Sequence, residues 1–455
     1  MKKRMCKIMA LAMTAAMVVP MAAQTTAFAA DDKEITYWNI AVESPDKDIV
    51  TAAVDKFNKE TKSGYTVNQV AIQNDTYKEK LVIAMSSGEC PDMYSSWSGG
   101  PMYEYIDSGF AQPIDDLLDQ SDVKDKLLDA AIEQGSYNGH VYAIPYLNVS
   151  LAGIFYNKDM FKQYGLEEPK TLADLENICA TLKENGITPF ALANASKWTG
   201  SMYFMSLAAR YGGLEPFQNA VAGTGKFTDD CFIKAGEKIQ EWVKNGYFPD
   251  GVNSLSEDDG QAKQLMYQET AGMLLCGSWY AGTFQTDSEE FYQKIGWFPF
   301  PAIDDSDADP TIQIGTVGDQ FICFNCEGDK LAAAFECATD HLSDEVEDMI
   351  YSTGKIAPVK DAGDHIKDPV VKEIFDAAQE ASSIQLWYDQ YLPTSVASAH
   401  LDGLQEVFGL TKTPQEAQEE MQTAMDEYLS TKSDSGAADD TAEEATDDAA
   451  ADDAE

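Results

Sequence analysis

The sequence predicts an α/β fold, in which helices cover a largely parallel sheet. Extended and helical patterns alternate from about residue 35 to residue 94, and a second alternating region begins near residue 151. Hydrophobic residues make up 44% of the 455 residues, which is enough to bury one or two sizeable cores. The chain is therefore expected to be globular and to contain two α/β regions.

The first region is expected to run strand, helix, strand, helix, strand. Its strands are predicted at 35–38, 65–72 and 92–94. Apolar residues at helical spacing predict helices at 49–57 and 77–85, and the second helix should stop at the Ser-Ser-Gly that follows it. Strands that alternate with helices in this way form a parallel sheet.

The second region begins with a strand at 151–156 and a helix at 159–164 that Gly165 closes. Thr171 and Asp174 have the spacing of a capping box at the start of a helix that runs to residue 182. Further helices are expected at 202–211, 230–244 and 257–268, strands at 273–275 and 313–324, and mainly helices from there to residue 429.

The charge balance argues against several classes of partner. With 32 Lys and Arg against 77 Asp and Glu, the formal net charge is −45 at pH 7. Such a surface repels the phosphates of nucleic acid and the headgroups of an anionic membrane. The 4 His are not spaced as metal ligands, so neither a zinc site nor any other cofactor is expected.

Residues 1–30 have the three parts of a secretory signal peptide: basic residues, an apolar run too short to span a membrane, and small residues before the cleavage point. The mature protein is expected to be exported, to the cell surface or to the periplasm. Cys6 precedes the apolar run, so it is not placed as the lipid-bearing cysteine of a lipobox. Removal of the signal peptide with Cys6 leaves an odd number of cysteines, which cannot all pair. The close pair Cys323 and Cys326 is expected to consist of packed thiols.

One acidic string copies the start of a calcium-binding loop, at Asp305, Asp307 and Asp309. Pro310 stands where that loop needs Gly, and Thr316 stands where it needs Glu. The segment is therefore expected to be a polar loop and not a metal site.

Six phrases occur along the chain in an order that is typical of one protein family. They are Ile-Thr-Tyr-Trp at 35–38, Ser-Gly-Glu-Cys-Pro-Asp at 87–92, Asn-Gly-His-Val-Tyr-Ala-Ile-Pro-Tyr at 138–146, Ile-Phe-Tyr-Asn-Lys-Asp-Met-Phe at 154–161, Asn-Gly-Ile-Thr-Pro at 185–189 and Gly-Ser-Trp at 277–279. Over about residues 34–429 the chain resembles the extracellular solute-binding proteins of ABC sugar importers, a family that contains multiple-sugar, raffinose and maltose binders.

The resemblance implies a two-lobe periplasmic-binding-protein fold whose hinge the chain crosses about three times, near Leu147, Phe300 and Ser343. On that pattern residues 31–147 with 301–343 form one lobe, and residues 148–300 with 344–430 form the other. Residues 431–455 are mostly small and acidic, without an aromatic side chain, and are expected to be a disordered tail.

Sugars present flat C–H faces rimmed by hydroxyl groups, so their sites combine aromatic rings with carboxylates and amides. Three Trp residues stand among small polar neighbours and resemble family segments that reach the cleft, although core packing would also suit them. Two acids are candidate hydroxyl acceptors. Residues 38–39 and 96–97 follow strand ends, where open α/β sheets bind ligands. The stacking candidates are Trp198, Trp279 and Trp387, the acids are Glu43 and Asp389, and the other candidates are Trp38, Asn39, Ser96, Trp97, Asn148 and Gln390.

The sequence thus predicts an exported, monomeric binding protein without catalytic residues. It should capture an oligosaccharide between its lobes and deliver it to the membrane permease of an ABC importer. The alternative is a secreted glycoside hydrolase, because the acids are numerous enough to supply a catalytic pair. No nucleophile elbow and no zinc-protease motif supports another hydrolase chemistry.

Overall fold

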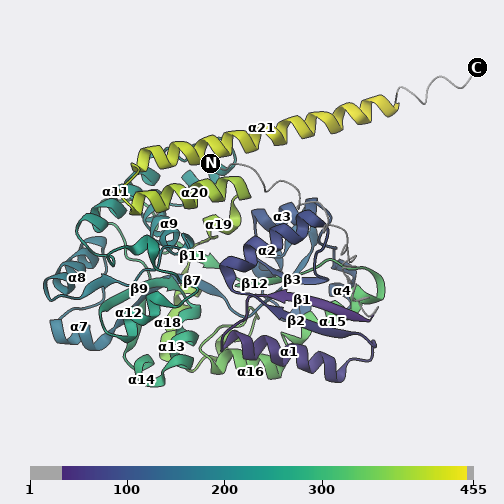
Figure 1. Ribbon diagram of the computed structural model, residues 1–455, viewed down its shortest axis with the longest axis horizontal. Coiled ribbons are helices and arrows are strands. Elements are labelled where there is room, and N and C mark those ends of the chain that lie inside the picture. The colour runs from purple at the N-terminus through teal and green to yellow at the C-terminus, as the bar shows by residue number, and fades with distance from the viewer. Residues whose placement is uncertain (1–32, 448–455) are drawn as a thin grey trace, which may run out of the picture.

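The computed structural model describes residues 33–447 and contains two lobes that lie side by side (Figure 1). Each lobe is built around its own sheet. Residues 1–32 and 448–455 lie outside the described residues, so the expected signal peptide at 1–30 does as well.

The first lobe contains a five-stranded sheet in the order β2-β1-β3-β12-β6. Its strands are β1 (Glu34–Asn39), β2 (Thr66–Ala71), β3 (Met93–Ser96), β6 (Ala143–Tyr146) and β12 (Gln320–Phe324). β1 pairs in parallel with β2 and with β3, which confirms the parallel arrangement predicted for this region. β12 runs antiparallel to both β3 and β6.

Helices of the first lobe bury the apolar stripes that the sequence predicted. α1 packs its buried stripe, from Ile49 to Phe57, beside β2, and α2 ends at Gly88, whose φ of +74° suits glycine. The helices are α1 (Asp46–Glu60), α2 (Asn74–Ser87), α3 (Gly100–Asp107), α4 (Asp115–Asp119), α5 (Val123–Lys126), α6 (Asp129–Gln134), α15 (Gly328–Asp340) and α16 (Asp344–Ser352); a small hairpin pairs β4 (Ser136–Tyr137) with β5 (His140–Val141).

The second lobe contains a six-stranded sheet with β7 at its centre. β7 is buried along its whole length and pairs antiparallel with β9, β10 and β11, so this sheet is mixed and not mainly parallel. Its strands are β7 (Ser150–Asn157), β8 (Thr188–Phe190), β9 (Ala271–Gly277), β10 (Ile295–Phe298), β11 (Gln313–Thr316) and β13 (Ile384–Gln385).

The helix signals predicted for the second region are confirmed. Thr171 and Asp174 form the capping box of α8, and Gly165 closes α7 with a φ of +67°. The helices of this part of the chain are α7 (Lys158–Tyr164), α8 (Leu172–Glu184), α9 (Trp198–Gly212), α10 (Glu215–Val221), α11 (Asp230–Lys244), η1 (Val252–Ser254), α12 (Gln261–Tyr267), α13 (Trp279–Asp287) and α14 (Glu289–Tyr292). The helices that follow α16 are α17 (Ala362–His365), α18 (Pro369–Glu380), α19 (Tyr388–Tyr391), α20 (Thr394–Phe408) and α21 (Pro414–Asp447).

The chain passes between the two sheets where β6 leads into β7, which agrees with the crossing expected near Leu147. It returns at 317–319, where β11 leads into β12. The expected single strand at 313–324 is therefore wrong, because its two halves belong to different sheets. α16 packs on α1 of the first lobe, and α18 packs on β10 of the second lobe. The chain therefore passes between the lobes a third time in the segment that joins α16 to α18.

Two expected crossings thus need correction. Arg210 is buried and its guanidinium donates to the carbonyls of Phe300 (2.9 Å) and Ile312 (2.7 Å). These bonds hold both ends of the loop at 301–311, which contains the acidic string, on the second lobe. The crossing expected near Phe300 therefore comes only after β11. Ser343 directly precedes α16, which packs on α1 and still belongs to the first lobe, so the last crossing also comes later than expected.

The passages meet at Asn148, which is 1% exposed. Its Oδ1 accepts a hydrogen bond from the backbone N–H of Ile356 (2.8 Å), and its carbonyl accepts one from the N–H of Asp319 (2.7 Å). Its Nδ2 donates to the hydroxyl of Ser278 (3.2 Å). Through its backbone carbonyl and its side-chain amide, this one buried residue therefore ties together the three segments that join the lobes.

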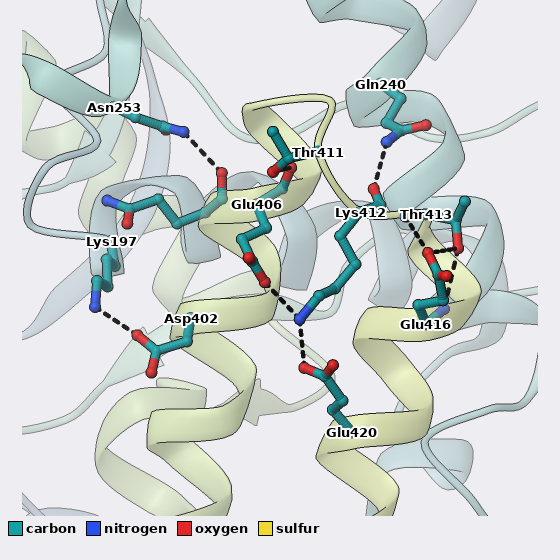
Figure 2. A network of polar contacts seen from close by, with 11 residues as sticks. Lys197, Gln240, Asn253, Asp402, Glu406, Thr411, Lys412, Thr413, Glu416 and Glu420 are labelled. Carbon is teal, nitrogen blue, oxygen red and sulfur yellow. Dashed lines mark hydrogen bonds and ion pairs between the residues drawn. The ribbon is translucent and has the colours of Figure 1, made fainter.

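The last two helices form a hairpin that is anchored on the second lobe (Figure 2). Lys412, in the turn between them, pairs with Glu406 on α20 and with Glu420 on α21 at 2.5 Å. Its carbonyl accepts a hydrogen bond from Gln240 of α11 (2.8 Å). Figure 2 also shows Lys197, just before α9, paired with Asp402 of α20.

α21 continues as helix to Asp447, through most of the segment expected to be a disordered tail. In Figure 1 its C-terminal half projects away from the two lobes. Ala and Glu, which are abundant there, have high helix propensity, so the backbone can keep helical geometry without a packed apolar stripe. Residues 448–455 lie outside the described residues.

Candidate ligand-binding cleft

A cavity of about 190 Å³ lies between the lobes, and it is called the inner cavity below. Both lobes and the hinge supply its walls. The first lobe contributes Ile40, Asp46, Asn74, Lys78 and Trp97, the second contributes Trp198, Met202, Met205, Glu257, Asp258, Trp279, Trp387, Asp389 and Gln390, and the segment at 317–324 contributes Asp319 and Gln320.

Three Trp rings form a continuous aromatic wall on the second lobe. The centroid of the Trp279 ring lies 6.1 Å from those of both Trp198 and Trp387. The interplanar angles are 56° and 69°, so the rings do not stack flat on one another. Trp198 and Trp279 remain partly exposed, which leaves aromatic surface available to a ligand.

The local chain explains why Trp279 faces the cavity. It follows β9 directly and begins α13, and its ring lies against Gly277. A Cβ at Gly277 would come within 1.9 Å of the Trp279 ring, so only glycine leaves room for this placement. Ser278, between them, donates its hydroxyl hydrogen to the carbonyl of Val149 (3.1 Å), which ties the segment to the hinge.

Trp198 begins α9 after a tight turn. Lys197 has a φ of +63°, and its ion pair with Asp402 (2.5 Å) holds the turn against α20. The side chain of Asn194 accepts a hydrogen bond from the N–H of Gly200 (3.0 Å), which fixes the first turn of the helix. The hairpin of Figure 2 thus supports the position of Trp198.

Opposite charges meet across the cleft where α2 faces α19. Lys78 of the first lobe lies 3.5 Å from the carboxylate of Asp389, whose side chain is 8% exposed. The ammonium group of Lys78 also lies 4.9 Å from the centre of the Trp97 ring, within cation–π distance. These three residues form the polar edge of the inner cavity.

A carboxyl group with a raised pKa lies in the loop before α12. Burial raises the pKa of Glu257 to about 7, against the opposing effects of a hydrogen bond from the Tyr280 hydroxyl and of the charge on Lys263. Its neighbour Asp258 accepts a hydrogen bond from the N–H of Asp75 (3.1 Å), across the cleft. Burial also raises the pKa of Asp258.

The hinge supplies a second carboxyl group whose pKa is raised by burial, that of Asp319. Burial raises the pKa of Asp319 to about 6, although the nearby Lys355 opposes the shift. Lys355 is buried and forms an ion pair of 2.5 Å with Asp46. Acidic oxygens therefore line the cavity from the hinge, from the first lobe and from the second.

Six of the sequence-predicted residues meet in the inner cavity. They are Trp97, Trp198, Trp279, Trp387, Asp389 and Gln390. Two others line cavities beside it: Glu43 borders one of about 170 Å³ and pairs with Lys263 at 3.5 Å, and Ser96 borders one of about 210 Å³.

The remaining three predicted residues line none of these three cavities. Trp38 packs in the smaller hydrophobic cluster of the first lobe. Asn39 is fully buried, and its Oδ1 accepts a hydrogen bond from the N–H of Ala41 (3.0 Å) to close a turn after β1. Asn148 lies in the hinge, where its side-chain amide bonds Ile356 and Ser278 and its backbone carbonyl bonds Asp319.

Several residues of the cavity were missed by the sequence analysis. Asn74 and Lys78 lie in the first turns of α2, directly after β2, so the strand-end rule applied to β2 would have pointed to them. Glu257 was placed in a helix expected at 257–268, but α12 begins only at Gln261. Gly260, with a φ of +66°, breaks the pattern and leaves Glu257 in the loop.

Within residues 33–447, no group of three or more His, Cys, Asp or Glu side chains is arranged to hold a metal ion. The seven cysteines of this range, Cys323 and Cys326 among them, are free thiols. No helix in the described part of the chain is long and apolar enough to cross a membrane.

Comparison with protein families gives one match over most of this structure. The family described as "Bacterial extracellular solute-binding protein" matches residues 41–336. This range covers most of the first lobe, the whole sheet of the second lobe except β13, and the hinge segments at 147–149 and 317–319.

Individual relatives agree with the family match. An uncharacterised ABC transporter extracellular-binding protein of Pyrococcus horikoshii is 32% identical over 228 residues, which is 50% of each chain. The multiple sugar-binding protein of Streptococcus mutans is 30% identical over 178 residues, 36% of this chain and 39% of its own. The alignments span about half or less of the length of these curated relatives.

A solved structure matches over nearly its entire length. It comes from a study of xylan utilisation by Caldanaerobius polysaccharolyticus and superposes with a TM-score of 0.78 at 29% sequence identity. The match covers 86% of this chain and 99% of that one. The two-lobe architecture is therefore shared, including both sides of the cleft.

Proposed function

The chain belongs to the bacterial extracellular solute-binding protein family, and we propose that it captures a neutral oligosaccharide in its inner cavity for an ABC importer. The observation that carries the proposal is the wall of Trp198, Trp279 and Trp387 facing polar side chains of the opposite lobe. Aromatic faces stack on the C–H faces of sugars, and the polar groups bind hydroxyls at the rim.

The charges of the cleft favour a ligand without negative charge. Asp46, Asp258, Asp319 and Asp389 are among its lining residues, against one lining lysine, Lys78. An anionic sugar would meet these carboxylates in a partly desolvated site, where like charges repel strongly. Hydroxyl groups, in contrast, can donate hydrogen bonds to each of them.

The relatives support the same ligand class. The multiple sugar-binding protein of Streptococcus mutans has sugars as its ligands according to its name. The solved structure that matches this chain comes from a study of xylan utilisation. We extend this to the chain as a whole: an exported, monomeric protein, at the cell surface or in the periplasm, that hands its sugar to permease subunits. With a net charge of −45, nucleic acid is not among its partners.

The proposal is tested by a thermal-shift panel of neutral oligosaccharides, beginning with xylo-, malto- and raffinose-type sugars. A true ligand should raise Tm by mass action and bind with a Kd of roughly 10 nM to 10 μM, or about −11 to −7 kcal/mol. Oligogalacturonides of matched length serve as the anionic control and should not bind. Failure of every neutral sugar would contradict the proposal.

The same samples separate binding from catalysis. Chromatography of the sugar after long incubation should return it unchanged, because a solute receptor releases what it captured. Shortened products would instead favour the glycoside hydrolase alternative, with two cleft carboxylates as the catalytic pair.

A further inference from the structure

A second cavity of about 210 Å³, called the outer cavity here, adjoins the inner one. Four residues line both cavities: Lys78, Trp97, Asp389 and Gln390. The outer cavity lies among α2, α3 and α20, so both lobes form it. A ligand that fills the inner cavity therefore has a direct neighbour compartment beyond Lys78.

The lining of the outer cavity is mainly apolar. Leu81, Val82, Pro101, Ala397 and Leu401 supply aliphatic surface. Leu81 is 2% exposed and Ala397 is 5% exposed, whereas Val82 is 48% exposed, so the wall combines buried and exposed aliphatic side chains. No tryptophan other than Trp97, which both cavities share, is among its lining residues.

Two hydroxyl groups of the outer cavity, those of Thr394 and Ser96, already have partners. The hydroxyl of Thr394 donates to the carboxylate of Glu104 (2.7 Å), across the two lobes. The hydroxyl of Ser96 donates to the carbonyl of Trp97 (3.5 Å). A sugar ring placed there would leave its own hydroxyls poorly matched, which is costly, whereas an apolar group would gain from burial.

We propose that the outer cavity is a subsite for an aryl or acyl group that is joined through oxygen to the sugar held in the inner cavity. The inference rests on the proposed sugar-binding function and deepens it, because it defines the ligand as a substituted oligosaccharide. An apolar cavity of about 150 Å³ holds a benzene ring, so a volume of about 210 Å³ accommodates one ring and a short link.

Lys78 stands at the junction between the two compartments. Its side chain is 34% exposed, and its ammonium group lies against both Asp389 and the ring of Trp97. An ammonium group has three donors. One can therefore bind the linking oxygen of an aryl glycoside or an ester while the ion pair with Asp389 persists.

The test compares two glycosides of the oligosaccharide that binds best in the panel, one methyl and one 4-nitrophenyl, by calorimetry. The aryl glycoside should bind about tenfold more tightly to the full-length protein, since it alone reaches the outer cavity. Equal affinity for the two glycosides would overturn the subsite and leave the proposed function standing. If no oligosaccharide of the panel binds, the proposed function and this inference fail together.

A matched pair of variants locates the aryl group. Val82 lines the outer cavity and is 48% exposed, so Val82→Asp should fold normally and reduce the tenfold preference to about twofold. Ile83, the next residue on α2, is 66% exposed and lines neither cavity, so Ile83→Asp should keep the full preference. A preference that survives Val82→Asp would place the aryl group elsewhere and overturn the proposal.

Discussion

The two walls of the inner cavity differ in chemistry. The second-lobe wall carries three of the four lining Trp residues, with Met202 and Met205 behind them. The first-lobe wall carries Asp46, Asn74 and Lys78, which are polar or charged. Stacking surface thus lies mainly on the second lobe, while hydrogen-bonding groups come from both lobes, since the second lobe also contributes Glu257, Asp258, Asp389 and Gln390.

Polar groups of both lobes also meet across the lobe boundary. The first lobe meets the second through Lys78 with Asp389, Glu43 with Lys263, the N–H of Asp75 with Asp258, and Glu104 with Thr394. All four are polar, and those between exposed charges are weakened by salt. The comparison teaches that ring stacking and lobe closure have different physical sources, so they can be perturbed separately.

The largest expected effect comes from removing the central ring of the aromatic wall. Trp279→Ala should weaken sugar binding by about 2 to 4 kcal/mol, as buried aromatic contacts at binding sites do. Calorimetry with the sugar identified in the panel measures it. The fold should persist, because Trp279 is only partly buried.

Trp242→Ala is the matched control for this ring. Trp242 is fully buried, stacks on Phe190 with centroids 5.6 Å apart and donates to the carboxylate of Glu176 (2.9 Å). Its removal should lower the free energy of unfolding by about 3 to 5 kcal/mol. If Trp279→Ala binds sugar normally, the aromatic wall is not the stacking surface.

A smaller effect is expected from the opposite wall. Lys78→Met leaves Asp389, whose side chain is 8% exposed, without its cation partner, and should weaken sugar binding by about 1 kcal/mol. Titrations at low and high salt measure both the loss and its salt dependence, which should be smaller in the variant than in the wild type. Lys80→Met, on the exposed side of α2, is the control, and an equal loss there would reject a specific role for Lys78.

The raised pKa of Glu257 predicts that the stability of the fold changes with pH. Burial raises the pKa of Glu257 from 4.5 to about 7 in the folded protein. Glu257 contributes fully to the stability of the fold below about pH 4.5, where it is protonated in both the folded and the unfolded state. This contribution is lost as the pH rises through about 7, because the folded state then holds an unfavourable buried charge. Glu257→Gln should therefore raise Tm at pH 8 by on the order of 2 °C and leave it unchanged at pH 4.

Differential scanning calorimetry at the two pH values measures this change. Glu269→Gln is a suitable control, because Glu269 is exposed and pairs with Lys294 at 2.8 Å on the surface. A rise of Tm at pH 4 as large as that at pH 8 would mean that packing, and not charge, explains the Glu257 variant.

Local signals in the sequence were sufficient for much of the fold. The alternation of β1, α1, β2, α2 and β3 follows from periodicity and from a glycine stop, and the capping box of α8 from two residues. Trp198, Trp279 and Trp387 were proposed from their small polar neighbours and from the family resemblance. Gly277 shows why such neighbours matter, because a side chain there would displace the Trp279 ring.

The errors arose because an apolar run in the sequence does not show which part of the fold each of its residues packs against. Residues 313–324 are almost all buried, so they read as one strand, yet β11 and β12 belong to different sheets. The change of sheet is fixed by long-range contacts, such as the bond from the N–H of Asp319 to the carbonyl of Asn148. Periodicity contains no information on such contacts.

The cleft residues near strand ends show a similar limit. Trp38 and Asn39 end β1, but Ile40 and Asp46, a few residues further on, reach the inner cavity. The strand-end rule locates the correct edge of the sheet and not the side chain that enters the cleft. Asn148 was proposed as an amide for the rim of the sugar site, but its side chain bonds Ile356 and Ser278 within the hinge.

The smallest effect is expected for a region outside both walls. α21 buries Ala417, Gln418, Met421, Gln422 and Met425, all before Tyr428, and these residues fasten it to the second lobe.

Deletion of residues 433–455 should therefore change neither Tm nor sugar affinity, because that segment has no aromatic residue and no large aliphatic one to pack on a lobe. It is acidic and has no basic residue, on a chain whose net charge is already −45, so its removal relieves a little repulsion, more at low salt. Full-length and truncated proteins are compared in one buffer by calorimetry and by sugar titration. A tenfold loss of affinity, about 1.4 kcal/mol, would show that the C-terminal segment contributes to the cleft and that binding does not reside in the two walls alone.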